Sequence, residues 1–470
     1  MTSDCVQTAP EEVVRPHGKL KFFSGLALLV TVLGFAIRLI LAPYVTYPFD
    51  IEHWAVILQN TESGNGLFGL TGYFYTPVWG YILGFEDVVI NSLFSVEYGR
   101  RALGLLGIEN LEFVYYTATT TSPGFNLLMK VPLILVDFLV GYIVYRLVLS
   151  HSGDERKAAG AYGLWFLCPL VIYMSAVQAQ FDCISALFML LCVLLLRKDR
   201  CFLAGVMFAL GSLIKFFPAF CILLLCMYIF KVHADPSARI RKFLLALVGA
   251  LFTVALVFLP QILDGTVIDA FSFIFGRTSE FSLVSALRTY PVILVTLVLM
   301  VVLVLHMRRM GEQECRDRFI TMVLLMLTIC VMISSGPQYC IVYLPLLAYY
   351  IFAGGANRPL MWCFIIITVT STVSAFFNNS LSILTTLVEY CGVWNADSLL
   401  SAMDVLETEI LGLTLRALAV TVSELIQTIF MIVLILFIAD DLGLLKRFGK
   451  LTHLSRRVRV KLGGVKIEEE

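Results

Sequence analysis

The stretch "FFSGLALLVTVLGFAIRLILAP" (22–43) is long and apolar, and it decides the class of this chain. Its only charged residue is Arg38. A helix needs about 20 apolar residues to cross the hydrocarbon core of a bilayer. Residues 1–21 are polar and too long for the charged start of a signal peptide. We therefore expect a retained first transmembrane helix.

The composition of the whole chain agrees with that stretch. The 470 residues are 59% hydrophobic and 14% charged, with a mean hydropathy of +0.88. Soluble domains carry about 25% charged residues, so this is an integral membrane protein. A net charge of zero argues against a nucleic-acid-binding protein. The 12 cysteines include no C-x-x-C pair and stand in apolar surroundings, so we interpret them as buried hydrophobic residues.

Further apolar runs predict the architecture. Besides 22–43 and a weaker run at 77–95, they lie at 125–148, 158–177, 183–196, 202–230, 241–260, 290–307, 319–334, 339–353, 359–377 and 410–438. We expect an all-α, polytopic transmembrane bundle of about 11–13 helices over residues 22–440. The polar tail 1–21 precedes it and a basic tail, 441–470, follows it.

The distribution of charge predicts the orientation. If 1–21 is cytosolic and 44–123 forms one long external loop, 26 of the 34 Lys and Arg residues lie inside, four outside and four in helices. That bias follows the positive-inside rule and also makes the tail 441–470 cytosolic. The first external loop is acidic and contains Asp50, Glu52, Glu62, Glu86, Asp87, Glu97, Glu109 and Glu112.

The run 202–230 departs from the pattern of single spans. Basic clusters flank it on both sides, "RKDR" (197–200) and "KVHADPSARIRK" (231–242), although it is too short for two full spans. Pro218 removes a backbone donor and disfavours helix just before it. We expect a broken hairpin with Lys215 at its apex, where irregular backbone must line a cavity or be buried in protein.

The start of the first external loop, "YVTYPFDIEHW" (44–54), combines carboxylates with aromatic residues. Its apolar residues and those that follow have helical spacing: Ile51, Trp54, Ala55 and Leu58. We expect an amphipathic helix on the membrane surface, with Trp54 in the interface. Asp50 stands where an N-cap belongs, so capping is the simplest role for it.

Charged residues also occur inside apolar runs, where they are costly and mark ion pairs or functional sites. Lys130 and Asp137 are seven residues apart on one helix face. For Asp137 a structural pair with a neighbouring helix and a functional role both remain open. Lys130 lies near the external end, where a cation can meet an anionic ligand. Arg38 is expected to extend toward the interface.

The other external segments are polar as well. They include "SAVQAQFD" (175–182), "FGRTSEFSLVSALRTYP" (275–291) and "SSGPQY" (334–339). Carboxylates, arginines, amides and a lysine therefore converge on the external face. The opposite face carries mainly solvated basic clusters.

The order of the motifs resembles a known family. An acidic motif in the first external loop is followed by "YFYTPVWGYIL" (73–83), K-x-P-x-x-x-x-D (130–137), P-x-x-I-x-x-S-A-x-x-x-Q-F-D (169–182), G-S-L-I-K-F-F-P (211–218) and P-Q-Y-x-x-x-x-L-P (337–345). Over about residues 22–355 the chain resembles the GT-C superfamily of integral-membrane glycosyltransferases, which use polyprenyl-phosphate-linked sugars. It is most similar to the prokaryotic polyprenyl-phosphate-mannose branch.

The resemblance implies roles for particular residues. Asp50 matches the catalytic general base, and Glu52 makes the motif D-x-E where some branches have D-x-D. The basic residues expected to bind the donor phosphate are Arg277, Arg288, Lys215 and Lys130. The residues expected to line the sugar or acceptor pocket are Tyr75, Gln180, Asp182, Gln338 and Tyr339.

The resemblance also implies partners and a location. The partners are a polyprenyl-phosphate-linked sugar donor, a lipid-linked or protein glycan acceptor, and membrane lipids, with no metal and no cofactor. The protein is expected in a prokaryotic plasma membrane with its site outside, or in the endoplasmic reticulum membrane of a eukaryote.

Chemistry agrees with a transferase. Sugar transfer from a lipid phosphate needs a base near the acceptor hydroxyl and positive charge where the leaving phosphate becomes negative. The chain has no P-loop or dinucleotide fingerprint in a strand–helix setting. A secondary transporter and a non-catalytic assembly subunit are the alternatives. Transporters often have two similar halves and a midplane charge cluster, whereas this chain has no internal repeat and an asymmetric polar face.

Overall fold

The computed structural model describes residues 23–463 except 65, 69–72, 74, 102–118, 273–282, 333–335, 354–356, 411 and 447–448. The predicted N-terminal tail therefore lies outside the described residues. The described part is a bundle of helices with two small two-stranded ribbons, which confirms the predicted fold class.

Several described helices are suited to crossing a membrane. Five are long and apolar enough to do so alone: α1 (Gly25–Tyr44), α4 (Pro123–Ser152), α10 (Pro236–Val257), α16 (Arg358–Asn378) and α19 (Leu415–Asp441). A sixth span is formed if α5 (Glu155–Phe166) and α6 (Pro169–Ala176) are counted as one, bent by 47°. Such a set is typical of a multi-pass membrane protein.

The other predicted runs also form helices, several of them short. They are α7 (Asp182–Arg197), α8 (Cys201–Ile214), η3 (Phe217–Cys221), α9 (Ile222–Val232), α11 (Leu259–Leu263), α13 (Leu283–Arg309), α14 (Glu312–Met332), η4 (Pro337–Val342) and α15 (Leu344–Ala353).

The connecting segments contain the remaining elements. These are α2 (Pro48–Glu62), α3 (Pro77–Val88), η1 (Val89–Phe94), β1 (Gly99–Arg101), β2 (Thr119–Thr121), η5 (Ser380–Leu384), α17 (Thr385–Cys391), α18 (Ala396–Leu406), β3 (Glu409–Ile410), β4 (Leu413–Thr414) and α20 (Gly449–Lys461). Strands β1 and β2 pair antiparallel, with Arg100 opposite Thr120. Strands β3 and β4 form a second antiparallel pair.

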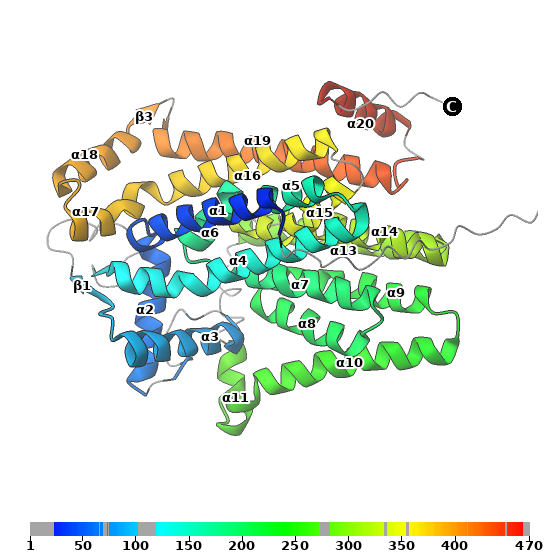
Figure 1. Ribbon diagram of the computed structural model, residues 1–470, viewed down its shortest axis with the longest axis horizontal. Coiled ribbons are helices and arrows are strands. Elements are labelled where there is room, and N and C mark those ends of the chain that lie inside the picture. Colours follow the sequence, from blue (N-terminus) through cyan, green and yellow to red (C-terminus); the bar gives the residue numbers. More distant parts are fainter. Residues whose placement is uncertain are drawn as a thin grey trace, which may run out of the picture.

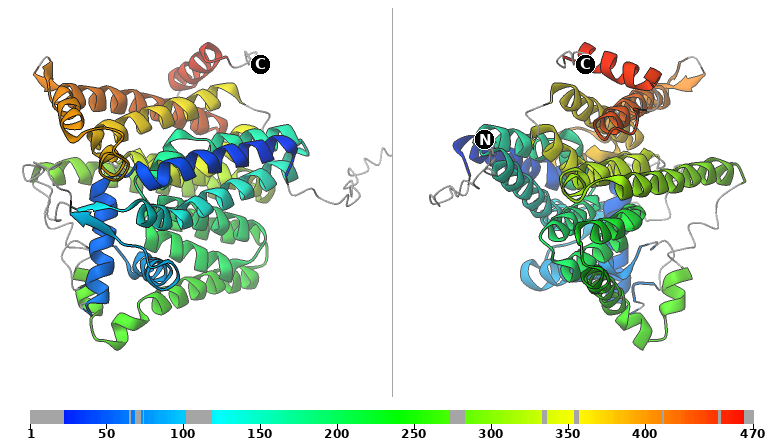
Figure 2. Two further views of the ribbon diagram at one scale, coloured as in Figure 1. Left: turned by 60° about the vertical axis from the view of Figure 1, so that its left-hand side comes forward. Right: turned by 90° about the vertical axis from the view of Figure 1, so that its right-hand side faces the viewer.

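Most of the long helices run in a common direction (Figure 1). At one end of the bundle lie α2, β1, α17 and α18, and at the other lie α20 and the turn between α9 and α10. We call these the α2 end and the α20 end. Helix α2 runs across the direction of the long helices, and a second view agrees (Figure 2). The apolar stripe predicted for this helix faces the protein and not a membrane, since Ile51, Trp54, Ala55 and Leu58 are all buried.

The centre of the bundle is formed by helices that are apolar on all sides. In α14 every residue from Phe319 to Val331 is buried, and α7 is buried along nearly its whole length. A helix that is hydrophobic all round belongs in the interior of a large bundle. Helices α16 and α19 pack side by side on one flank (Figures 1 and 2).

One predicted span is broken. The run 158–177 forms two helices, because Pro169 cannot supply a backbone N–H to continue α5. It instead occupies the first turn of α6, where that N–H is not needed. The resulting bend of 47° separates α5 from the short helix that leads to the Q-x-Q-F-D segment.

The broken hairpin predicted for 202–230 is confirmed. Helix α8 ends at Ile214, Lys215 has an extended backbone (φ −144°, ψ 135°), and the 3₁₀ helix η3 leads into α9. The turn before α8 and the segment after α9 are joined, since Asp199 Oδ1 lies 2.9 Å from His233 Nε2. Asp199 also pairs with Lys242. Both outer ends of the hairpin therefore lie on one side, and its apex points away from them.

Close packing of α8 on α10 predicts a sensitive glycine. A Cβ on Gly249 would collide with the backbone carbonyl of Phe202, which cannot rotate away as a side chain can. We expect Gly249→Ala to destabilise the protein by about 1–3 kcal/mol, as overpacking does. The matched control is Gly84→Ala in α3, where a Cβ would have no neighbour within 4 Å. Thermal unfolding in detergent measures both, and equal melting temperatures would contradict the prediction.

Candidate functional site

Lys215 stands at the apex of the hairpin among a carboxylate and three aromatic rings. Its side chain is 10% exposed, and its Nζ lies 3.5 Å from Oδ2 of Asp182. The same Nζ lies 4.6 Å from the ring centroid of Phe181, 5.4 Å from that of Tyr75 and 5.3 Å from that of Tyr339. Cations are attracted to aromatic faces at such distances. We call these five residues the Lys215 cluster.

Four distant chain segments build the Lys215 cluster. Tyr75 precedes α3, Phe181 and Asp182 begin α7, and Tyr339 belongs to η4. The start of α3 is hydrogen-bonded to the end of α8, because Thr76 Oγ1 donates to the carbonyl of Leu213 at 2.7 Å.

The structure thus brings together residues that the sequence predicted separately. Asp182, Tyr75 and Tyr339 were expected to line a sugar pocket and Lys215 to bind phosphate, and all four meet in one cluster. Phe181 was not predicted, although it stands inside the Q-F-D motif. Its position between Gln180 and Asp182 in that motif is the feature of the sequence from which it could have been predicted.

Asp182 is fully buried in the first turn of α7. Within the described part of the chain, neither of its carboxylate oxygens accepts a hydrogen bond. Its charge is balanced by Lys215 and by the partial positive charge at the start of a helix. A buried ion pair without supporting hydrogen bonds is a weak source of stability.

The turn before Asp182 is strained. Ala179 has φ of +54°, in the left-handed region that residues with a Cβ rarely occupy. It lies between Gln178 and Gln180, both largely buried, and the backbone N–H of Gln180 donates to the carbonyl of Met174 at 2.9 Å. Such strain is concentrated at functional sites. Gln180, predicted to line the pocket, is thus adjacent in sequence to the Lys215 cluster.

Gln338 and Tyr339 lie over Gly336 at the start of η4. A Cβ on Gly336 would be 2.6 Å from the Tyr339 ring and 2.8 Å from Gln338 Nε2. The absence of a side chain at position 336 therefore lets both groups fold back over the backbone. Tyr339 also contacts Phe217, with ring centroids 4.8 Å apart.

An aromatic bridge joins α2 to the Lys215 cluster. The Trp54 ring centroid lies 5.8 Å from that of Tyr75 and 5.9 Å from that of Phe181. Trp79 of α3 stacks on Phe181 at 4.3 Å. Trp54 is 1% exposed, so the prediction of an interfacial Trp54 is wrong, because these rings enclose it. Asp50 lies one helical turn before Trp54, which places it close to the bridge.

Asp50 does not cap α2. The N-cap residue is Tyr47, Pro48 begins the helix, and Asp50 follows within the first turn. The capping interpretation is therefore wrong. A carboxylate in the first turn is still favoured by the helix dipole. Asp50 is partly exposed, and its charge contributes to the raised pKa of the Tyr47 phenol, which is due mainly to burial.

Glu52 is the second carboxylate of the D-x-E motif and also lies in α2. Burial raises the pKa of its carboxyl to about 8. Glu52 is therefore mostly protonated at neutral pH and is then a hydrogen-bond donor rather than a base. Glu52 is therefore poorly suited to accept a proton at neutral pH.

Glu52→Gln tests that protonation. Between pH 4.5, the ordinary pKa of Glu, and pH 8 the unfolded state ionises while the native state stays protonated, so native stability falls as pH rises. The Gln side chain does not ionise, so the Glu52→Gln variant does not lose stability in this way as the pH rises. We expect the melting temperature of the variant to exceed that of the wild type by an amount that grows from pH 5 to pH 8 and is constant above. Glu155→Gln, on an exposed carboxyl, is the control. A difference independent of pH contradicts the prediction.

Lys130 is buried at the corner between α1 and α2. Its Nζ donates to the carbonyl of Ala42 at 2.8 Å, to the carbonyl of Val45 at 3.2 Å and to Thr46 Oγ1 at 2.6 Å. Its side chain is fully buried. With three donors on an ammonium and three acceptors here, Lys130 is bound to the protein itself and not placed to bind a phosphate. Its hydrogen bonds stabilise the corner between α1 and α2, which precedes Asp50.

Lys130→Met is expected to lower both stability and activity. It removes the Lys130 donor from two buried acceptors and one part-buried acceptor, and a buried group left unsatisfied costs about 1–3 kcal/mol. Displacement of α2 should reduce kcat more than it changes KM. The matched control is Lys231→Met, since that partly exposed lysine also donates to a carbonyl, that of Arg308, at 3.0 Å. Melting temperatures and steady-state rates measure the effects, and wild-type values for both would contradict the prediction.

Asp137 pairs with Arg38 from the neighbouring helix α1. Arg38 donates to Asp137 Oδ2 from Nε at 3.2 Å and from a terminal nitrogen at 3.1 Å, and to the carbonyl of Phe166 at 2.7 Å. Both side chains are fully buried. Of the two roles considered for Asp137, the structure therefore shows the structural ion pair with a neighbouring helix. The expectation that Arg38 extends to the interface is wrong, because its guanidinium is held inside the bundle.

Two predicted phosphate-binding residues are not described in full. Arg277 falls in 273–282, outside the described residues. Arg288 belongs to α13, but its side chain is outside the described part. Both remain predictions from the sequence.

Comparison with known families adds an independent finding. Residues 127–335 match the model of glycosyltransferase family 87. The matched segment contains the start of α7 and the hairpin apex, and so includes both Asp182 and Lys215. It is somewhat less than half of the chain and does not include α2. No curated protein matches the chain. The match supports membrane glycosyltransferase activity.

The arrangement can bind an anion next to a polar, partly aromatic surface. A lysine placed in a mostly buried site attracts a phosphate strongly, because little water competes for it. Within the described residues no three His, Cys, Asp or Glu side chains are grouped as metal ligands.

Proposed function

We propose that the protein is a membrane glycosyltransferase that moves a sugar from a polyprenyl phosphate to an acceptor hydroxyl at the α2 end. The observation that carries the proposal is the Lys215 cluster, a cation enclosed by a carboxylate and three rings within the segment that matches glycosyltransferase family 87. Mannose is the first candidate for the sugar, on the resemblance to the polyprenyl-phosphate-mannose branch.

In the proposed reaction the acceptor oxygen forms a bond to the anomeric carbon, and the bond from that carbon to the phosphate oxygen breaks. Asp50 takes the hydroxyl proton as general base. The polyprenyl phosphate leaves with the bonding electrons, and Lys215 stabilises its growing negative charge together with Arg277 and Arg288. Tyr75, Gln180, Gln338 and Tyr339 are proposed to surround the sugar or acceptor.

Glu52 is proposed to assist in its protonated form. A raised pKa of about 8 suits a donor of a hydrogen bond at neutral pH. Lys130 is proposed to hold the α1–α2 corner and so to fix the position of Asp50, instead of binding the phosphate as first predicted.

The α2 end is proposed to face outside, and the basic tail after residue 440 to lie in the cytosol. Charge asymmetry along the chain supports this orientation. The donor is then a lipid-linked sugar in the outer or lumenal leaflet, and the acceptor a lipid-linked or protein glycan. The membrane is a prokaryotic plasma membrane or that of the endoplasmic reticulum.

A direct comparison of donors tests the proposal. Purified protein is given labelled polyprenyl-phosphate mannose, polyprenyl-phosphate glucose or a nucleotide sugar, with extracted membrane lipids as acceptors. We expect transfer from a polyprenyl phosphate and none from the nucleotide sugar. Transfer from the nucleotide sugar alone would overturn the proposed donor class. Transport of a solute into liposomes, without any transfer, would favour a transporter.

A further inference from the structure

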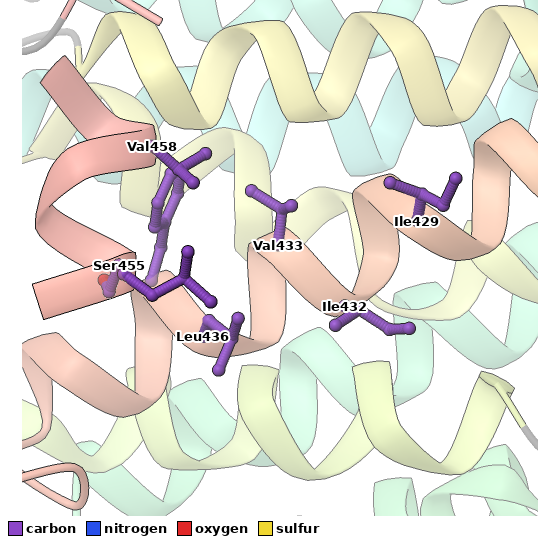
Figure 3. Close-up of a pocket in the computed structure, with 8 residues that line it drawn as sticks. Ile429, Ile432, Val433, Leu436, Ser455 and Val458 are labelled. Atoms are coloured by element: carbon purple, nitrogen blue, oxygen red, sulfur yellow. The ribbon is translucent and has the colours of Figure 1, made fainter. Parts of the chain in front are cut away.

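A cavity of about 220 Å³ lies between α19 and α20, where α20 crosses α19 (Figures 1 and 3). Its lining is apolar and comes from both helices, including Ile429, Val433 and Phe437 of α19 and Leu454 and Val458 of α20. Figure 3 shows these walls following α19 from its crossing with α20 toward the middle of the helix. The cavity is therefore elongated along a membrane-spanning helix.

Helix α20 is fixed in place over this cavity. Ser455 Oγ donates to Asp440 Oδ2 at 3.0 Å, and Arg459 pairs with Asp441 at 2.9 Å. Arg459 also donates to the carbonyl of Phe437 at 3.1 Å. These contacts hold α20 across the end of α19 and make the cavity a built feature of the fold.

The cavity is continuous with the surface that faces lipid. Leu425, Ile429 and Ile432 lie on one side of α19 at helical spacing and are 59%, 48% and 45% exposed. Large exposed aliphatic side chains on a membrane-spanning helix contact hydrocarbon. Ile429 and Ile432 also line the cavity. A hydrocarbon chain can therefore enter from the bilayer along α19 without passing polar groups.

Positive charge flanks the same cavity. Lys450, Arg457 and Lys461 are exposed and share one face of α20 with Leu454, at spacings of three and four residues. Helix α20 contains no acidic residue. Within the described residues none of these three side chains has a carboxylate partner. This face is suited to an anion at the membrane surface.

We propose that this cavity binds one acyl chain of an anionic phospholipid, whose headgroup is bound by Lys450 and Arg457. The apolar walls suit the acyl chain, and the basic face of α20 suits an anionic headgroup. An amphipathic, basic helix at a membrane surface binds anionic lipids in the same way, by burying its apolar side chains and by attracting the negative headgroups. The site is independent of the proposed sugar transfer.

Lipid binding by the purified full-length protein tests this inference. Native mass spectrometry counts phosphatidylglycerol and phosphatidylcholine with identical acyl chains on the same sample. We expect a preference for phosphatidylglycerol that Lys450→Gln/Arg457→Gln removes, each charge contributing about fivefold in affinity. Lys198→Gln/Arg200→Gln, which removes two exposed charges from the turn between α7 and α8, should keep the preference.

A second pair of variants tests the cavity itself. Val433→Trp fills it and should reduce retention of both lipids, whereas Leu425→Trp, on the lipid-facing side outside the cavity, should not. Equal binding of both lipids by the wild type, or equal retention by the two Trp variants, would overturn the inference. So would competition by glycerol phosphate as strong as that by the intact lipid, because the acyl chain would then be unnecessary.

Discussion

Lys215→Met is expected to lower the rate of sugar transfer by about 10²–10³-fold, the usual cost of losing one preorganised group that stabilises developing negative charge. The side chain is 10% exposed, so its charge acts where water competes little. Met keeps most of the length and apolar volume of the stem. The effect should appear in kcat, because the phosphate becomes most negative as the bond to the sugar breaks. Lys215→Arg should retain part of the rate.

The neighbouring carboxylate provides the control for folding. Removing Lys215 alone leaves Asp182 buried and unpaired, which costs about 3–5 kcal/mol for a typical buried pair. Lys215→Met/Asp182→Asn removes both charges and should recover most of the lost melting temperature. If the double variant also recovers transfer, Lys215 acts only through the structural pair, and its role in binding phosphate is wrong.

Asp50→Asn is expected to lower transfer by about 10²–10⁴-fold, the range usual for loss of a general base. Asn is nearly isosteric, and Asp50 makes no cap that the change would remove. Binding of the donor should change little, because the base acts on the acceptor hydroxyl. Rates with a fixed donor concentration and varied acceptor measure the effect.

Glu52→Gln is the matched control for Asp50→Asn, since both change a carboxyl to an amide in the first turns of α2. Glu52 is already protonated at neutral pH, so its amide variant should retain substantial activity at pH 7. If Asp50→Asn is as active as the wild type and Glu52→Gln is inactive, the two roles are reversed. A transfer rate that rises as the pH increases through about 8 would also indicate that Glu52 is the general base.

Much of the site was accessible from the sequence, because the chemistry was carried by polar residues in apolar surroundings. Pro218 predicted the hairpin break and so the position of Lys215 at its apex. The motif Q-F-D marked Asp182. That Lys215 and Asp182 form one pair was not predictable, since it depends on how α7 packs against the end of α8.

Other features depend on packing that one sequence does not reveal. Lys130 was expected to meet a ligand because it stands near a helix end, yet three acceptors from the α1–α2 corner surround it. Trp54 was expected at the interface from its stripe, but the stripe says only which face is buried, not against what. Arg38 and Asp137 come from helices far apart in the chain.

Cross-linking can locate the lipid phosphate on the protein. A photoreactive polyprenyl phosphate, the product of the proposed reaction, is cross-linked to the purified protein, and the labelled peptides are identified. We expect labelling of peptides that contain Tyr75, Phe181 or Tyr339, and loss of that labelling when unlabelled polyprenyl phosphate is added or when Lys215 is replaced by Met. Labelling confined to α19 and α20, or unchanged by either treatment, would contradict this prediction.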